Sequence, residues 1–562
     1  MIRMFLASTL LLLMQTSIAI PGADTVYVNG KIYSGEQPSP WADTLAVKGD
    51  RIVFVGSYKN AQPFITNATQ TVDLQGRLAL PGFYDLHVHP DLLFEPKYTN
   101  QIQTLPLGPK ALKKAILKYA ANQPGQGWIF GGTWAVDAFS AAGIKPSATF
   151  LDSFMPDRPL AILDTARHNM LVNSKAMELA GIDENTFEPD HGLIGRDQYG
   201  KPNGLFSDGA QSLFSALLPQ GNWQVMRDSY GEAQALLNQY GFVGARSQHV
   251  NTQRLQGVQA LERAGKLTVR YDMAISWKND LHFTVPDRPA LLAGERHRYR
   301  SKHVNANYVK FHVDGNAGSQ SALYLDPYQG TNYLGKSNET MEELKALLVQ
   351  LDKEGISVQM HVIGDGAARM VLDALEYMRG VNGQSGVRHS LLHCYTLSEE
   401  DAGRIGALNV SAEFSYNFLS PALKPYMDYF VNQVLDPATV PRLLNIRSAL
   451  DHGAKATFGS DLVVSPTPNI FPALAAMLER PDFPEKSITL AEAITMLTIN
   501  GAWAMGREQE AGSLKAGKYA DFVVLDRNWF EITPKEIAAT KVVSTVFEGT
   551  EVYRWNPALT SQ

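Results

Sequence analysis

Cysteine is almost absent from this chain. Cys394 is the one cysteine among 562 residues, whereas histidine occurs 13 times. A single thiol can form neither an internal disulfide nor a thiolate zinc cluster. Any metal site must therefore be built from histidine, aspartate, glutamate or a modified lysine.

Charge is also scarce, and neither sign dominates locally. Charged residues make up 19% of the chain, and the formal net charge is −6 without long runs of one sign. This share is below the roughly 25% of an average soluble protein, so a large apolar core is feasible and disorder is excluded. The lack of a basic patch argues against a nucleic-acid partner. We expect a small-molecule substrate, and the sequence leaves a homo-dimer open.

Long hydrophobic runs are absent after the first twenty residues. Residues 1–19 combine Arg3, an apolar centre at residues 10–14, and the small residues Ser17 and Ala19. This pattern is typical of a signal peptide that is cleaved after Ala19. The alternative is a membrane anchor, but residues 4–20 are slightly short for a span of about 20 residues. We therefore expect export to the periplasm or the medium of a bacterium, with no stable membrane partner after cleavage.

Short β-strands are predicted at both ends of the chain. Alternating apolar residues separated by turn residues occupy residues 25–33, 44–56, 520–525 and 542–549. Neither end has enough strands to bury a core alone. Residues 20–80 and 512–562 are therefore predicted to form one composite β-sandwich domain.

The central part, residues 81–511, predicts an α/β fold. Short apolar strands alternate there with helical patterns, which is typical of parallel βα units. Eight such units predict a (β/α)₈ barrel. A segment at about 91–240, rich in glycine, proline and tryptophan, is too long for one crossover and is predicted to be an insertion. The eight candidate strands are residues 83–89, 242–249, 267–275, 308–313, 356–361, 390–394, 410–414 and 456–460.

Residues with metal-binding side chains cluster at the ends of these candidate strands. His87 and His89 are two residues apart, so they point to the same face of a strand. A (β/α)₈ barrel gathers the carboxyl ends of its strands around one mouth, where active sites of this fold lie. We therefore expect a metal centre there. The other candidates near strand ends are Lys310, His361, His393 and Asp461.

The order of these residues resembles the amidohydrolase superfamily. The closer match is the amidohydrolase-3 branch, the YtcJ-like proteins, which include N-substituted formamide deformylases. The motifs that carry the resemblance are PGFYDLHVH at 81–89, GWI with GTW at 127–134, RHN with VNS at 167–174, and GSLKAGKYAD at 512–521. They extend over nearly the whole chain after residue 19.

The resemblance implies two divalent ions, with zinc the expected metal. His87, His89 and Asp461 would hold one ion, and His361 and His393 the second. Lys310 would bridge them as a carbamate. An ammonium cannot ligate a metal, and a desolvated lysine has a lowered pKa that favours its reaction with carbon dioxide. The alternative is an unmodified Lys310 paired with Asp314, together with a single metal.

The implied activity is hydrolysis of a non-peptide C–N bond, such as an amide or formamide, in a small substrate. A metal-activated hydroxide would attack the carbonyl, and Asp461 would move the proton to the leaving amine. His168 is a candidate for holding the carbonyl oxygen, or else a packing residue. Asp365 is expected either to orient a ligand or to cap the next helix. Asp314 and His312 are expected beside the ligands.

The sequence departs from the branch at three places. Leu392 stands where glutamate usually precedes the last histidine, residues 241–247 lack a threonine and an aspartate, and His312 replaces a small or apolar residue. Three other functions remain open. One is a peptidase, and another is a deaminase of cyclic amidines, which Lys310 disfavours. The third is a non-catalytic binding or regulatory protein, which the complete ligand set disfavours.

Overall fold

The computed structural model describes residues 22–556 apart from 100, 103–105, 190–191, 220, 278–287, 466 and 481. The predicted signal peptide lies outside these residues. Within the described ranges, no helix is long and apolar enough to cross a bilayer.

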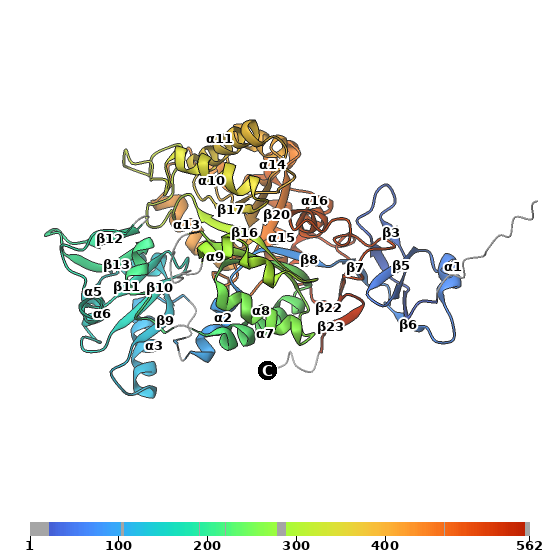
Figure 1. The fold of residues 1–562 in the computed structure, drawn as a ribbon, viewed down its shortest axis with the longest axis horizontal. Helices are drawn as coiled ribbons and strands as arrows, with labels where there is room; N and C mark the ends of the chain where they lie inside the picture. The colour runs from blue at the N-terminus through green and yellow to red at the C-terminus, as the bar shows by residue number, and fades with distance from the viewer. Residues whose placement is uncertain are drawn as a thin grey trace, which may run out of the picture.

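Eight parallel strands form the centre of the molecule (Figure 1). The sheet order is β20-β19-β18-β17-β16-β15-β14-β8, and a bridge from Val88 to Leu462 brings its two edges together. The fold-class prediction is therefore confirmed. The strands are β8 (Phe83–Val88), β14 (Phe242–Val250), β15 (Arg270–Ser276), β16 (Val304–His312), β17 (Ser357–His361), β18 (Ser390–Leu392), β19 (Ser411–Ser415) and β20 (Lys455–Gly459).

The barrel strands are buried on both faces because helices cover the outside of the sheet. In α10, Leu344, Leu347, Leu348 and Leu351 are buried, which is the spacing of one helix face. Thr340 and Glu343 form a capping box that starts this helix. The helices between the strands include α8 (Thr252–Arg263), α10 (Met341–Lys353), α11 (Asp365–Asn382), α12 (Glu399–Ala407) and α14 (Ile446–Asp451).

A β-sandwich at one side of the barrel is built from both chain ends (Figure 1). Its mixed sheet pairs β7 (Leu78–Pro81) with β21 (Phe522–Leu525), for example Leu80 with Val523. Side chains from both chain ends, including Leu45 and Val524, share its core. The other strands are β1 (Thr25–Val28), β2 (Lys31–Tyr33), β3 (Trp41–Ala42), β4 (Thr44–Lys48), β5 (Arg51–Gly56), β6 (Gln70–Asp73), β22 (Val542–Phe547) and β23 (Thr550–Arg554).

The segment predicted as an insertion contains a sheet of its own, on the side of the barrel opposite the β-sandwich (Figure 1). Its strand order is β12-β13-β11-β10-β9. The final part of the segment is α7 (Trp223–Gln239), which packs against α8 and so belongs to the barrel layer. The strands are β9 (Ile129–Trp134), β10 (Leu160–Asp164), β11 (Asn169–Val172), β12 (Gly192–Arg196) and β13 (Pro202–Asp208).

Arg270 connects the barrel to the β-sandwich. It lies at the start of β15, fully buried, with its guanidinium 2.6 Å from Asp521 and 2.7 Å from Glu548. The guanidinium carbon also lies 4.3 Å from the ring centre of Tyr519. Because both carboxylates come from the C-terminal β segment, this one side chain ties a barrel strand to that segment.

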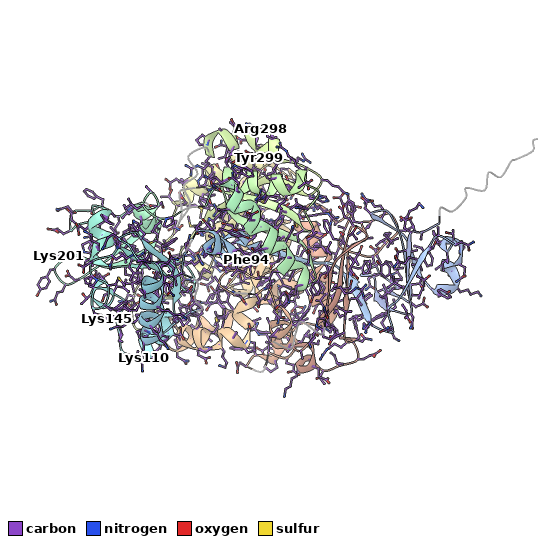
Figure 2. The ribbon with its side chains drawn as sticks, turned by 90° about the horizontal axis from the view of Figure 1, so that it is seen from below. Phe94, Lys110, Lys145, Lys201, Arg298 and Tyr299 are labelled. Atoms are coloured by element: carbon purple, nitrogen blue, oxygen red, sulfur yellow. The ribbon has the colours of Figure 1, made fainter. Side chains whose placement is uncertain are left out.

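We predict that Arg270→Ala lowers the free energy of unfolding by about 3–5 kcal/mol, because it leaves buried carboxylates without their cation. The matched control is Arg298→Ala. Arg298 is 69% exposed and pairs with Glu295 on the surface (Figure 2), so its removal should cost under about 1 kcal/mol. Urea unfolding followed by tryptophan fluorescence measures both. Equal, small effects would contradict the role given to Arg270.

Candidate metal centre

The predicted ligands meet in one buried pocket at the carboxyl ends of the barrel strands. His87 lies in β8, and Lys310 lies in β16. His361 ends β17, whereas His393 and Asp461 follow shortly after β18 and β20. The pocket is lined by His87, His89, Leu92, Ala166, Arg167, His168, His249, Lys310, His312, His361, His393, Asp461, Val463 and Val464.

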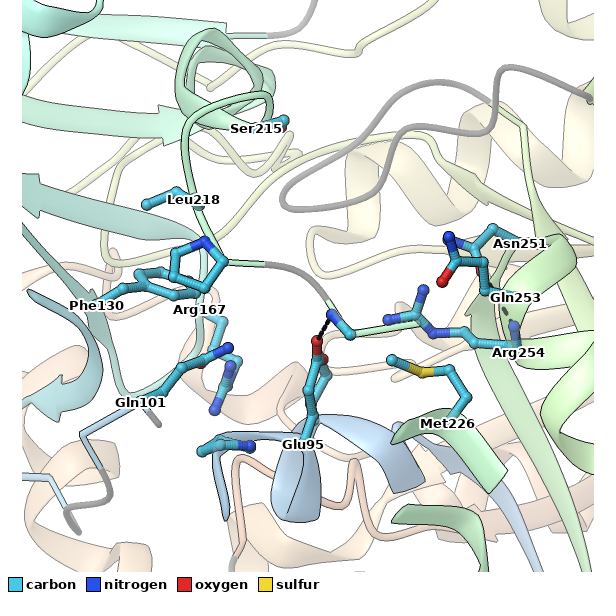
Figure 3. A pocket seen from close by; sticks show the side chains of 14 residues that line it. Glu95, Gln101, Phe130, Arg167, Ser215, Leu218, Met226, Asn251, Gln253 and Arg254 are labelled. Atoms are coloured by element: carbon cyan, nitrogen blue, oxygen red, sulfur yellow. Dashed lines mark hydrogen bonds between the residues drawn. The ribbon is translucent and has the colours of Figure 1, made fainter. Parts of the chain in front are cut away.

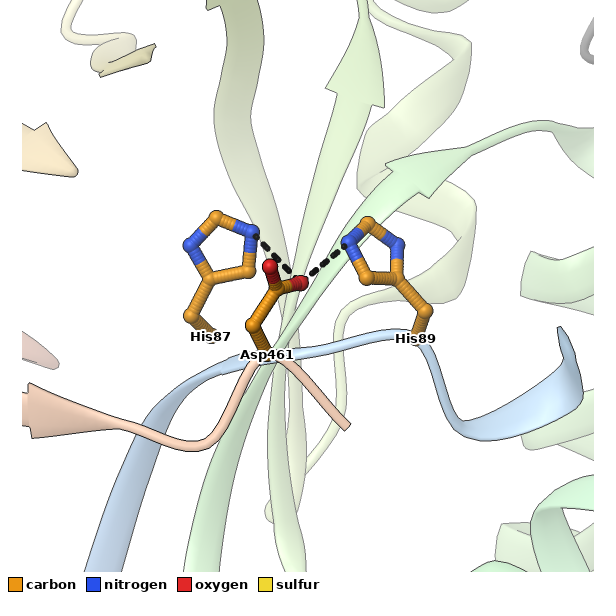
Figure 4. A group of neighbouring side chains, drawn as sticks. All are labelled: His87, His89 and Asp461. Carbon is orange, nitrogen blue, oxygen red and sulfur yellow. Dashed lines mark ion pairs between the residues drawn. The ribbon is translucent and has the colours of Figure 1, made fainter. Parts of the chain in front are cut away.

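His87, His89 and Asp461 form a compact group (Figure 4). The Oδ1 atom of Asp461 lies 3.3 Å from Nε2 of His89 and 3.8 Å from Nε2 of His87. One ligand atom from each residue lies within 4.8 Å of the others. Two imidazoles and a carboxylate in this arrangement suit Zn²⁺ and similar divalent ions.

Six imidazole rings form a closed circuit around the pocket. Neighbouring ring centres are 4.4–5.3 Å apart. Two members, His249 and His312, complete the circuit between His89 and His361. His249 was not predicted as a site residue, although it lies near the end of β14 and a search for histidines at strand ends would have found it. The circuit runs through His87, His89, His249, His312, His361 and His393.

Burial keeps these imidazoles in the form that binds metal. It lowers the pKa of His87 well below its ordinary value, and the charge of Lys310 lowers it further. Burial likewise lowers the pKa of His361, assisted by His312. It does the same for His393, assisted by His87. Neutral imidazole is the metal-binding form, so burial favours the protonation state that ligation requires.

Glu413 on β19 is a functional candidate that the sequence did not indicate. Its Oε2 accepts a hydrogen bond from the N–H of His393 at 2.7 Å and lies 3.3 Å from Nδ1 of His87. Burial raises the pKa of Glu413 to about 8. Leu392 occupies the position where the resemblance expects glutamate, and Glu413 brings a carboxylate to His393 from the neighbouring strand. The sequence feature that could have identified Glu413 as a site residue is its position as a charged residue within a buried strand.

The close approach of β20 to β19 and β8 beside Glu413 and His87 requires a glycine at position 459. A Cβ atom at Gly459 would lie 2.4 Å from Oε1 of Glu413 and 2.6 Å from Cβ of His87. Such distances are far shorter than van der Waals contact, so Gly459 lets β20, β19 and β8 converge.

Asp85 fixes the two strands that carry the compact group. Its Oδ1 accepts hydrogen bonds from the N–H of His87 at 3.2 Å and of Ser460 at 2.9 Å. The N–H of Asp461 then donates to the carbonyl of His87 at 2.8 Å. Burial raises the pKa of Asp85 to about 7.

His168 reaches the pocket from the insertion. It lies between β10 and β11, and its ring centre is 5.2 Å from that of His361. Its Nδ1 lies 2.6 Å from Oδ1 of Asp208, a residue that the sequence did not indicate. The Ser321 hydroxyl donates to the other carboxylate oxygen of Asp208 at 2.9 Å. The insertion therefore holds an oriented imidazole against the barrel ligands.

Asp314 and Asp365 lie on either side of the loop after His361. Asp314 accepts hydrogen bonds from the N–H groups of Ile363 and Gly364 at 3.0 and 2.8 Å, which holds that loop in place. Burial raises the pKa of Asp314 to about 7. Asp365 instead begins α11 and lies 2.5 Å from Arg442. These contacts place Asp365 at the helix start and not beside the metal ligands.

Comparison with known proteins agrees with this geometry. A model described as Amidohydrolase family matches residues 70–553. The chain belongs to the amidohydrolase family. Among relatives of this amidohydrolase, Protein LONG AFTER FAR-RED 3 of Arabidopsis thaliana is 28% identical, over 94% of this chain and 92% of that protein. The N-substituted formamide deformylase of Arthrobacter pascens is 26% identical, over 94% and 97%.

The solved structures show the same fold. A metal-dependent hydrolase of Pyrococcus horikoshii superposes with a TM-score of 0.69 and 19% identity, covering 91% of this chain and 99% of that one. The family and branch predicted from the motifs are therefore confirmed. The prediction of a metal-dependent hydrolase is confirmed at the level of the amidohydrolase family, with candidate metal-binding groups present.

Proposed function

We propose that this amidohydrolase hydrolyses an amide or formamide C–N bond, other than a peptide bond, in a small substrate. The observation that carries the proposal is Asp461, whose carboxylate lies beside two imidazoles inside a pocket lined by further histidines. The likeness to an N-substituted formamide deformylase over nearly the whole chain supports this type of bond.

We further propose two zinc ions as the resident metals. His87, His89 and Asp461 would hold one, and His361 and His393 the other, with Lys310 as a bridging carbamate. The donor chemistry fits, because the rings of His361 and His393 lie 4.5 Å apart and Lys310 lines the same pocket. When bound, such ions acidify a water molecule and polarise a carbonyl group.

Asp461 is placed to move a proton. Its backbone has φ 49° and its N–H is tied to the carbonyl of His87, so its carboxylate is held over the pocket. An ionised carboxylate in this position can accept a proton from the attacking water and release it to the leaving amine.

His168 is placed to bind the carbonyl oxygen. With Nδ1 directed at Asp208, Nε2 is the ring nitrogen that can address the substrate. The Asp208 carboxylate stabilises the imidazolium form, which donates a hydrogen bond from that atom. The apolar side chains of Leu92, Val463 and Val464 line the same pocket.

We predict that Asp461→Asn largely retains its metal, because the amide oxygen can replace the ligand oxygen, and that it loses about 10²–10⁴-fold in kcat, because the amide cannot carry the proton. Asp373→Asn is the matched control, since Asp373 is on the exposed face of α11 and pairs with Arg404. Elemental analysis and hydrolysis of a panel of N-formyl and N-acyl amines measure the two effects. Full activity in Asp461→Asn would rule out the proton transfer assigned to this residue.

We also propose that the protein is exported, on the basis of the residue 1–19 pattern. In a bacterial host, the mature protein should be recovered from the periplasm or the medium with Ile20 as its first residue, as N-terminal sequencing would show. A chain retained in the cytoplasm with residues 1–19 intact would contradict the proposal.

A further inference from the structure

Arg167 is a positively charged side chain at the metal pocket that the proposed reaction does not use. It directly precedes His168 in the hairpin between β10 and β11, and its φ is +60°. Asp164 holds this turn, because its carbonyl accepts the Arg167 N–H at 3.0 Å and its carboxylate accepts the Asn169 N–H at 3.0 Å. The same turn thus positions both Arg167 and His168.

Arg167 lines the metal pocket and two adjoining hollows. The first hollow lies between α2 (Pro90–Tyr98), the insertion and the start of α8 (Figure 3). The second lies beside β9 and is also lined by Gly131 and Thr133. Leu92 and Arg167 are the two residues common to all three linings. A substrate group that extends from the metal pocket into either hollow therefore passes the guanidinium.

The guanidinium has no partner of its own. Within the described part of the chain, no carboxylate lies within 4.0 Å of it and no hydrogen bond from it is formed. The adjacent Arg254, in contrast, lies 2.5 Å from Asp91. Removal from water lowers the pKa of Arg167 to about 10. Glu95 and Asp91 act on this charge from a distance but form no ion pair with it, so the paired N–H donors of the guanidinium point to a ligand that supplies a carboxylate.

The neighbouring acid Glu95 does not form an ion pair with Arg167. Glu95 lines the first hollow, but its carboxylate accepts the N–H of Gly221 at 2.7 Å (Figure 3). Burial and the neighbouring Asp91 raise the pKa of Glu95, which weakens its competition for the guanidinium. Since Asp91 pairs with Arg254, Arg167 is the one arginine among the described residues lining this hollow that has no ion pair, and this suits a carboxylate ligand.

We propose that Arg167 binds a carboxylate of the substrate, so that the preferred substrates are amides of carboxylate-bearing molecules such as N-acylated amino acids. This inference rests on the proposed function. A guanidinium binds a carboxylate through two parallel hydrogen bonds. Phe130 and Met226 in the wall of the first hollow favour an apolar substituent beside the carboxylate.

Three probes with the same aromatic group test the inference. N-acetylphenylalanine carries the carboxylate on the amine half, N-(2-phenylethyl)succinamic acid carries it on the acyl half, and N-acetyl-2-phenylethylamine has none. Their dissociation constants are measured by calorimetry on zinc-loaded Asp461→Asn protein. At least one carboxylate probe should bind about tenfold or more tightly than the neutral probe. The better of the two shows which half of the substrate faces Arg167.

We call the ratio of the dissociation constant of the neutral probe to that of the better carboxylate probe the carboxylate preference. The same measurements on Asp461→Asn/Arg167→Met should give a carboxylate preference near one. Asp461→Asn/Arg167→Lys should give an intermediate preference, because lysine keeps the charge but not the paired hydrogen bonds. Asp461→Asn/Arg298→Met is the control and should keep the full preference. A preference that survives Arg167→Met, or no measurable binding of either carboxylate probe, would overturn the inference.

Turnover separates this inference from the proposed function. If the wild-type protein cleaves no amide while the binding preference depends on Arg167, the proposed reaction fails and the carboxylate site stands. If the wild-type protein cleaves the neutral and carboxylate probes with equal kcat/KM, the proposed reaction stands and the carboxylate site is overturned.

Discussion

The site depends on the closure of the barrel by Asp85. This buried carboxylate accepts the N–H of His87, on the first strand of the sheet, and the N–H of Ser460, directly after the last strand. The compact metal group lies directly beyond this link. Together with the hydrogen bond from the Asp461 N–H to the His87 carbonyl, this link anchors the segment carrying His87 and His89 to the segment carrying Asp461 at the point where their side chains meet. Gly459 and Glu413 then bring the remaining strand ends to the same place.

In the proposed reaction, recognition and chemistry come from different parts of the chain. The barrel supplies the convergent ligands, whose backbone is held in a regular sheet. The insertion supplies His168 and Arg167 from one tight hairpin, oriented by Asp208 and Asp164. Because these two residues are adjacent, one turn positions both the group that would hold the carbonyl oxygen and the group that would hold a carboxylate. Substrate preference can thus change in the insertion without altering the metal ligands.

The barrel was predictable because its strands are buried on both faces and alternate with helices. Each of the eight predicted segments coincides with one barrel strand, although β16 begins at Val304, ahead of the predicted start at residue 308. Side chains alternate between the two faces of a strand, so the spacing of His87 and His89 likewise predicted that they share one face. Asp85, Asp208 and Glu413 could not be assigned in this way. Their roles arise from contacts across long sequence separations, such as the 326 residues between His87 and Glu413.

Zinc-edge anomalous diffraction from crystals of the zinc-loaded protein tests the central claim most directly. The account predicts two anomalous peaks. One should lie among His87, His89 and Asp461, and the other beside His361 and His393, with electron density for a carbamate extending from Lys310 between them. A single peak with an unmodified Lys310 would contradict the two-metal centre. No peak at His87, His89 and Asp461 would contradict the assignment of the site itself.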